Sequence, residues 1–164
     1  MGSSKAAHAR YVLFVVCVML LFLFLLPYHH TEQSQFGDSA SGEAYQASGI
    51  AKAPSTTEYI LDWLDGTNTQ KLVVFAHHKE VLDYIETTIA AKYKGRLGMM
   101  RIDGSVPPAE RALRVKKFQT NEKVRLSLLS MTAAGVGLTL TAASNIIFAE
   151  LHWTPGILAQ CEDR

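Results

Sequence analysis

The chain of 164 residues has few of the features that define several large protein classes. Its two cysteines, Cys17 and Cys161, are separated by almost the whole chain, so neither a disulfide framework nor a cysteine metal site is predicted. A formal net charge of +1 does not identify a protein that binds a polyanion. The sequence contains no internal repeat. Because 48% of the residues are hydrophobic and 19% are charged, general disorder is excluded, and we expect one domain of ordinary size.

The N-terminal region contains one long hydrophobic run. From Tyr11 to Leu26 there are sixteen apolar or aromatic residues without a charge, preceded by a basic flank over residues 1–10 and closed by Pro27. A bilayer core needs about 20 apolar residues, so the run is marginal as a membrane span. We expect a separate hydrophobic helix over residues 11–27. Three interpretations stay open: an uncleaved signal-anchor with the membrane as partner, a signal peptide, and an N-terminus created by gene rearrangement or a misplaced start codon.

Residues 28–49 have the composition of a flexible linker. They are rich in Ser, Gly, Gln, His and Glu and show no apolar periodicity. The folded domain is therefore predicted over residues 50–164. It should open with a short helix, because Ser55 to Glu58 form a helix-start pattern and Gly66 ends the apolar spacing that follows.

Four segments of strand length follow, separated by segments with helical spacing. The strands are predicted over residues 72–76, 97–102, 124–130 and 145–149, and the helices between them over residues 79–94 and 107–118. The first strand is continuously apolar, as expected for a strand covered on both faces, and strands that alternate with helices are typical of a parallel sheet. The predicted fold class is therefore α/β, with a parallel sheet covered by helices on both faces.

Polar residues follow the carboxyl ends of these strands, where open parallel sheets bind their ligands. Four clusters lie there: His77-His78, Asp103-Gly104-Ser105, residues 130–137 and residues 150–153. Each is weak evidence when taken alone. A histidine pair after a strand is more often a hydrogen-bonded pair than a base, and Asp-Gly-Ser is commonly a turn. The Gly135-x-Gly137 pair lacks a complete phosphate-binding pattern, so it is equally a packing turn.

The order and spacing of four segments are far more specific. They read KLVVFAHHK over residues 71–79, RIDGS over 101–105 with Glu110-Arg111, LSMTAAGVGLT over 129–139, and QCEDR over 160–164. Together they resemble helicase motifs IV to VI of superfamily two. The resemblance covers residues 49–164 and is greatest to the Swi/Snf-type DNA translocases, especially the annealing-helicase branch known as HARP. It implies the C-terminal, second RecA-like lobe of such an enzyme, ending inside its last motif and therefore incomplete.

The resemblance also implies roles for individual residues. Arg164 corresponds to the catalytic motif VI arginine that reaches the nucleotide phosphates; such an arginine accelerates related phosphoryl transfers about 10³–10⁵-fold. Gly137 and Thr139 correspond to the segment near the nucleotide ribose. The residues implied in holding the DNA backbone, through hydroxyls and exposed N–H groups, are His77, Gly104, Ser105 and Thr132.

We also make predictions for two surfaces of the domain. Charged residues on the helix after Ser105 either attract DNA or form an ordinary solvated face: Arg111, Arg114, Lys116 and Lys117. The surface that meets the first lobe should expose apolar residues, for which Trp153 and Leu138 are the candidates.

The chain contains no Gly-x-x-x-x-Gly-Lys-Ser/Thr segment to cradle phosphates, and no Asp-Glu-x-His-like segment for magnesium. ATP and Mg²⁺ are therefore expected only together with the first RecA-like lobe, and the isolated chain should not hydrolyse ATP. The resemblance implies a nuclear protein whose partners are DNA and that first lobe. Two alternatives remain: a membrane-anchored, non-catalytic lobe that binds nucleic acid or a partner, and an unrelated flavodoxin-like enzyme that uses His77 or His78 as a base.

Overall fold

The structure, a computed structural model, describes residues 37–66, 69–134, 138–152 and 154–162. Residues from Asp38 onward belong to one compact unit. The predicted hydrophobic helix over residues 11–27 and the first part of the predicted linker lie outside the described residues. Among the helices that are described, none combines the length and the apolar content needed to cross a bilayer.

The centre of the unit is a four-stranded parallel sheet in the order β2-β3-β1-β4. Its strands are β1 (Lys71–Ala76), β2 (Gly98–Ile102), β3 (Val124–Ser130) and β4 (Ala143–Phe148). The sequence predicted each of them, with bounds that differ by at most two residues. The pairing is irregular only at strand starts in this sheet, between Lys71 and Leu72 and between Gly98 and Met99.

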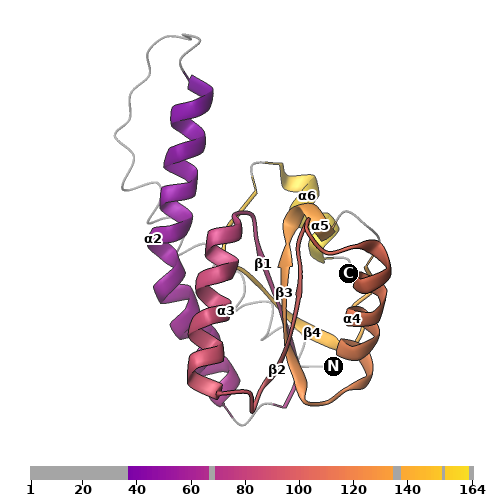
Figure 1. The fold of residues 1–164 in the computed structure, drawn as a ribbon. Helices are drawn as coiled ribbons and strands as arrows, with labels where there is room; N and C mark the ends of the chain where they lie inside the picture. The colour runs from indigo at the N-terminus through magenta and orange to yellow at the C-terminus, as the bar shows by residue number, and fades with distance from the viewer. Residues whose placement is uncertain (1–36, 67–68, 135–137, 153, 163–164) are drawn as a thin grey trace, which may run out of the picture. The chain divides into compact units, whose positions relative to one another are not determined.

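Helices cover both faces of the sheet, as predicted (Figure 1). On one face, α2 (Gly37–Asp65) and α3 (Lys79–Tyr93) pack on β1 and β3 through residues such as Ile60 and Ile85. On the other face lie α4 (Pro108–Thr120), α5 (Met131–Ala134) and α6 (Pro155–Glu162). Alternate residues of β1 therefore enter two different cores: Leu72, Val74 and Ala76 in one, Val73 and Phe75 in the other.

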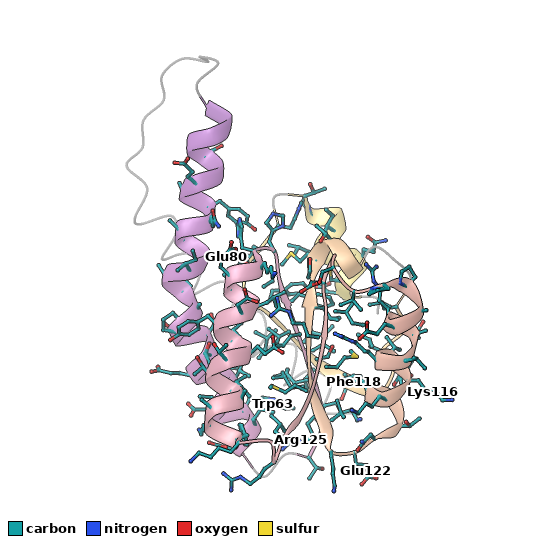
Figure 2. All side chains as sticks on the ribbon, viewed as in Figure 1. Trp63, Glu80, Lys116, Phe118, Glu122 and Arg125 are labelled. Carbon is teal, nitrogen blue, oxygen red and sulfur yellow. The ribbon has the colours of Figure 1, made fainter. Side chains whose placement is uncertain are left out.

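Local signals explain the helix bounds. Helix α3 ends where Lys94 and Gly95 adopt left-handed conformations, with φ of 48° and 79°, as expected for a glycine stop. Helix α4 begins at Pro108, whose missing N–H is not needed in a first turn. Its Phe118 faces the sheet, whereas Lys116 extends away from it (Figure 2).

The predicted linker is wrong for residues 37–49, because they form the first half of α2. This helix continues through Pro54 to Asp65 and includes the short helix predicted after Ser55. Toward its middle the buried face consists of the small residues Gly49 and Ala53, and Gly49 lets the helix pass close to the Glu150 side chain. A search for large apolar side chains at helical spacing does not detect such a face.

Candidate nucleic-acid interface

The candidate DNA-binding residues lie at the edge of the sheet that is formed by the carboxyl ends of its strands. His77 directly follows β1, Gly104 and Ser105 follow β2, and Thr132 follows β3. The strands are parallel and in register at this end, with Ala76 opposite Ser130 and Ile102 opposite Leu129. The sequence predicted this convergence, and the structure confirms it. The role of these residues in DNA binding stays a prediction.

The loop after β2 is held by Asp103. Its Oδ1 accepts hydrogen bonds from the backbone N–H of Ser105 at 2.9 Å and from the Ser105 hydroxyl at 2.5 Å. The hydrogen bond from the Ser105 hydroxyl, with those from the Ser105 N–H and Arg101, lowers the pKa of the Asp103 carboxyl, and burial opposes this shift only in part. Both donors of Ser105 already bind Asp103, so Ser105 can donate to a phosphate only after releasing one. Gly104 is exposed, and a Cβ placed on it would meet no atom within 4 Å.

Arg101 fastens this loop to α3. Its Nη1 lies 2.6 Å from Asp83 Oδ1 and 2.6 Å from Glu86 Oε2, and its Nε donates to Asp103 Oδ2 at 3.0 Å. The Arg101 side chain is only 13% exposed, so these ion pairs are less screened than surface pairs. The loop carrying Gly104 therefore has a fixed position relative to α3.

Thr132 lies in α5, directly beyond the end of β3, and is exposed. Its Oγ1 lies 2.6 Å from the Oγ of Ser130, which is buried. This contact orients the Thr132 side chain without burying it. Thr132 is therefore the candidate hydroxyl that is most accessible to a phosphate.

The histidine pair after β1 is bound by a buried glutamate that sequence reasoning placed only within a cluster, residues 150–153. Glu150 is 2% exposed and follows β4, the strand beside β1. Its Oε2 accepts the backbone N–H groups of His77 at 2.9 Å and His78 at 2.8 Å, and its Oε1 lies 2.6 Å from His78 Nδ1. The backbone N–H of His77 is therefore not available to a DNA phosphate.

The His77 side chain lies among other rings. The centroids of His78, His152 and Tyr45 are 4.7, 5.3 and 5.6 Å from it. Burial, and then the neighbouring His78 and His152, lower the pKa of His77 below the ordinary histidine value, and Glu150 opposes them in part. In the described part of the chain, the buried Nδ1 of His77 has no hydrogen-bond partner. The lowered pKa favours the uncharged form of the ring.

The described residues contain no group of three or more His, Cys, Asp or Glu side chains arranged to hold a metal ion.

Of the residues implied in nucleotide binding, Gly137 and Arg164 lie outside the described residues. Thr139 is described and exposed, and its carbonyl accepts a hydrogen bond from Gln119 Nε2 at 2.8 Å. Leu138 is 8% exposed and packs in the core with Leu140, so the prediction that it lies open on a lobe interface is wrong. The other candidate, Trp153, lies outside the described residues.

The charged face of α4 is partly engaged in structural contacts. Arg111 donates to the carbonyl of Val106 at 2.6 Å. Arg114 donates to the carbonyl of Arg101 at 2.5 Å and to Glu110 at 2.6 Å. Lys116 and Lys117 are exposed. The two arginines therefore support the loop after β2, whereas the two lysines form a solvated face.

Comparisons with known proteins identify the relatives of this fold. The helicase conserved C-terminal domain family matches residues 55–164. A Caenorhabditis elegans protein named SWI/SNF-related matrix-associated actin-dependent regulator of chromatin subfamily A-like protein 1 homolog is 45% identical over 124 residues, which cover 74% of this chain and 18% of that protein. The human DNA annealing helicase and endonuclease ZRANB3 is 42% identical over 120 residues, 73% of this chain and 11% of that protein. The crystal structure of the C-terminal part of the Fun30 ATPase domain matches with a TM-score of 0.58 and 26% identity, over 65% of this chain and 35% of that chain.

These relatives confirm the predicted resemblance to Swi/Snf-type proteins and to annealing helicases. The chain spans less than a fifth of the length of the two curated relatives it matches, at 18% and 11%.

Proposed function

Because the chain belongs to the helicase conserved C-terminal domain family, we propose that residues 50–164 serve as the second RecA-like lobe of an ATP-dependent DNA translocase of the annealing-helicase kind. Helix α2 leads into this lobe. One observation carries this proposal: three candidate DNA-binding loops, each from a different strand, lie at the same edge of the sheet. The relatives named as an annealing helicase and as a regulator of chromatin support DNA as the substrate and the nucleus as the location.

The edge suits contact with the DNA backbone rather than with bases. Gly104 leaves open space for a close approach, and Thr132 offers an exposed hydroxyl. His77 contributes no positive charge at neutral pH. Because a buried N–H without a partner is more costly than a buried lone pair, we assign the ring proton of His77 to Nε2, which can donate to a phosphate oxygen. Such contacts carry no sequence information.

The nucleotide would be shared with a first lobe. The sequence has no phosphate cradle of its own, so ATP and Mg²⁺ would bind only when that lobe is supplied. Arg164, Gly137 and Thr139 would then face the nucleotide, and the exposed side chain of Thr139 fits this position. Bound ATP supplies the free energy that drives movement along DNA. The role of Arg164 is to stabilise charge on the phosphates.

The test is to map DNA binding on the isotope-labelled chain by nuclear magnetic resonance. A short duplex is added at low salt, with an expected Kd of about 10⁻⁴ M or weaker. Amide signals of Gly104, Thr132 and their neighbours should shift, and the shifts should disappear as salt is raised. Signals at the opposite edge, such as those of Gly98 and Lys123, are the internal control. Shifts confined to that opposite edge, or no shifts at all, would contradict the proposal.

ATP hydrolysis is measured on the same sample. The chain alone should show no DNA-stimulated turnover. Turnover by the chain alone would mean that it does not act as one lobe of a two-lobe enzyme.

A further inference from the structure

The loops that follow β1 and β4 are joined by several independent contacts. Glu150 accepts both backbone N–H groups of the histidine pair. The N–H of Ala149 donates to the carbonyl of Phe75 at 2.8 Å, which extends the pairing of the two strands to their ends. The hydroxyl of Tyr45, whose ring lies against the histidine pair, donates to the carbonyl of Leu151.

The surroundings of Glu150 are specific for a carboxylate. A buried charge lowers stability unless it is paired and hydrogen-bonded. Here the carboxylate lies at the start of α3, where the helix dipole favours an anion, and it binds two N–H groups and the His78 ring. Burial lowers the pKa of Lys52 in α2, and the attraction of the nearby Glu150 carboxylate opposes this shift in part.

The two joined loops have different tasks under the proposed function, on which this inference rests. The loop after β1 carries His77, a candidate DNA contact. The segment after β4 leads into α6, which ends at Glu162, two residues before Arg164. We infer that Glu150 is a positioning residue that makes the DNA-facing loop at His77 and the segment leading to the nucleotide-facing arginine move together.

The competing explanation is that Glu150 contributes to stability alone. Hydrogen exchange at individual amides distinguishes this explanation from a positioning role. The variants Glu150→Ala and Glu150→Gln are compared with Ile147→Val, which removes one methylene from the core at β4, the strand that leads to Glu150. At His77 and His78, exchange should accelerate about tenfold or more in Glu150→Ala and less in Glu150→Gln, whose amide oxygen still accepts one bond. Ile147→Val should not accelerate these two amides beyond its effect on the other strand-end amides.

The reciprocal variant tests the coupling itself. His78→Ala removes the ring contact from the first loop and should accelerate exchange at Leu151 and His152 in the second loop. If His78→Ala affects only its own loop, and Glu150→Ala affects only residues 149–152, the loops are independent and the inference fails. If Glu150→Ala does not fold, Glu150→Gln, which keeps the size of the side chain, serves for the same comparison.

DNA titration of the same variants tests the functional part. Glu150→Gln should weaken the edge-specific binding about threefold or more, and Ile147→Val should not. Unchanged binding in a Glu150→Gln variant with faster exchange would overturn the positioning role. If the wild-type chain itself shows no DNA binding at this edge, the proposed function fails, and the exchange results still decide whether the two loops are coupled.

Discussion

A Cβ on Gly49 would lie 2.3 Å from Oε1 of Glu150, closer than real Cβ atoms approach other atoms. Helix α2 therefore passes directly over the buried carboxylate at the end of β4, and only a glycine allows this approach. In an unobstructed helix, replacing glycine by alanine stabilises the fold by about 0.5–1 kcal/mol. At position 49 the steric conflict with Glu150 should reverse that sign.

We predict that Gly49→Ala lowers the free energy of unfolding by about 1–3 kcal/mol, measured by urea denaturation. The matched control is Gly42→Ala on the same helix, where a Cβ meets nothing within 4 Å and the stability should rise. A Gly49→Ala variant at least as stable as the wild type would show that α2 does not pack on Glu150.

Gly104→Ala separates folding from binding at the edge that we propose to face DNA. Since nothing lies within 4 Å of a Cβ at this position, the free energy of unfolding should change by no more than about 0.5 kcal/mol. If a DNA backbone approaches the loop closely, the added methyl group should weaken the affinity by a few-fold. Equal affinities of the variant and the wild type in a fluorescence anisotropy titration would exclude Gly104 from the interface.

The lowered pKa of His77 predicts a dependence of stability on pH. The folded-state pKa lies below the unfolded value of about 6.5, so the unfolded state binds more protons as the pH falls below that value. The contribution of His77 is therefore fully present above about pH 6.5 and is lost progressively at lower pH. His78, His152 and Glu150 are the charged or titratable neighbours of the ring, and Tyr45 packs against it.

The measurement is urea unfolding of the wild type and His77→Gln at several values between pH 7.5 and 5. The wild type should lose more stability than the variant over this interval, because glutamine does not titrate. Identical slopes would show that the ring is not kept neutral by the fold.

Two tyrosines should ionise far above the ordinary range. Burial and the hydrogen bond to Asp65 at 2.6 Å raise the pKa of Tyr93 to about 12. Burial and the nearby Glu150 raise the pKa of Tyr45 to about 12. Since both phenols stay protonated in the folded state, their stabilising contribution is present below about pH 10 and declines toward pH 12.

Tyrosinate absorbance, followed against pH, tests these values. Tyr93→Phe and Tyr45→Phe should each remove part of the change near pH 12, and the double variant should remove both parts. If the absorbance near pH 12 is the same in all four proteins, neither hydroxyl has the environment described.

Strand β1 was predictable because residues 72–76 are continuously apolar, and a strand buried on both faces leaves that pattern in the sequence. The end of α3 was predictable from Gly95. The family resemblance was misleading for Leu138, which was expected on the surface that meets the first lobe but packs in the second core with Leu140.

The role of Glu150 could not be predicted from chain order. Its contact with the histidine pair depends on β4 lying beside β1 rather than beside β3, the strand that precedes it in the sequence. The first half of α2 escaped prediction for a different reason: the residue that it buries is Gly49, which contributes little hydrophobicity. Close backbone approach, rather than burial of large side chains, defines that contact.

The strands pair regularly toward their carboxyl ends, where the candidate DNA-binding loops begin. This pairing has a mechanical consequence. Under the proposed function, the loops at the ends of β1, β2 and β3 would bear the load when the lobe moves along DNA. Because the strands are parallel and their irregular pairing lies at their starts, a pull along β1 acts on its hydrogen bonds to β3 and β4 in shear. Many bonds then share the load at once, instead of opening one after another as in a zipper. We expect the sheet to resist tension applied at His77 more strongly than tension of equal size applied across the strands.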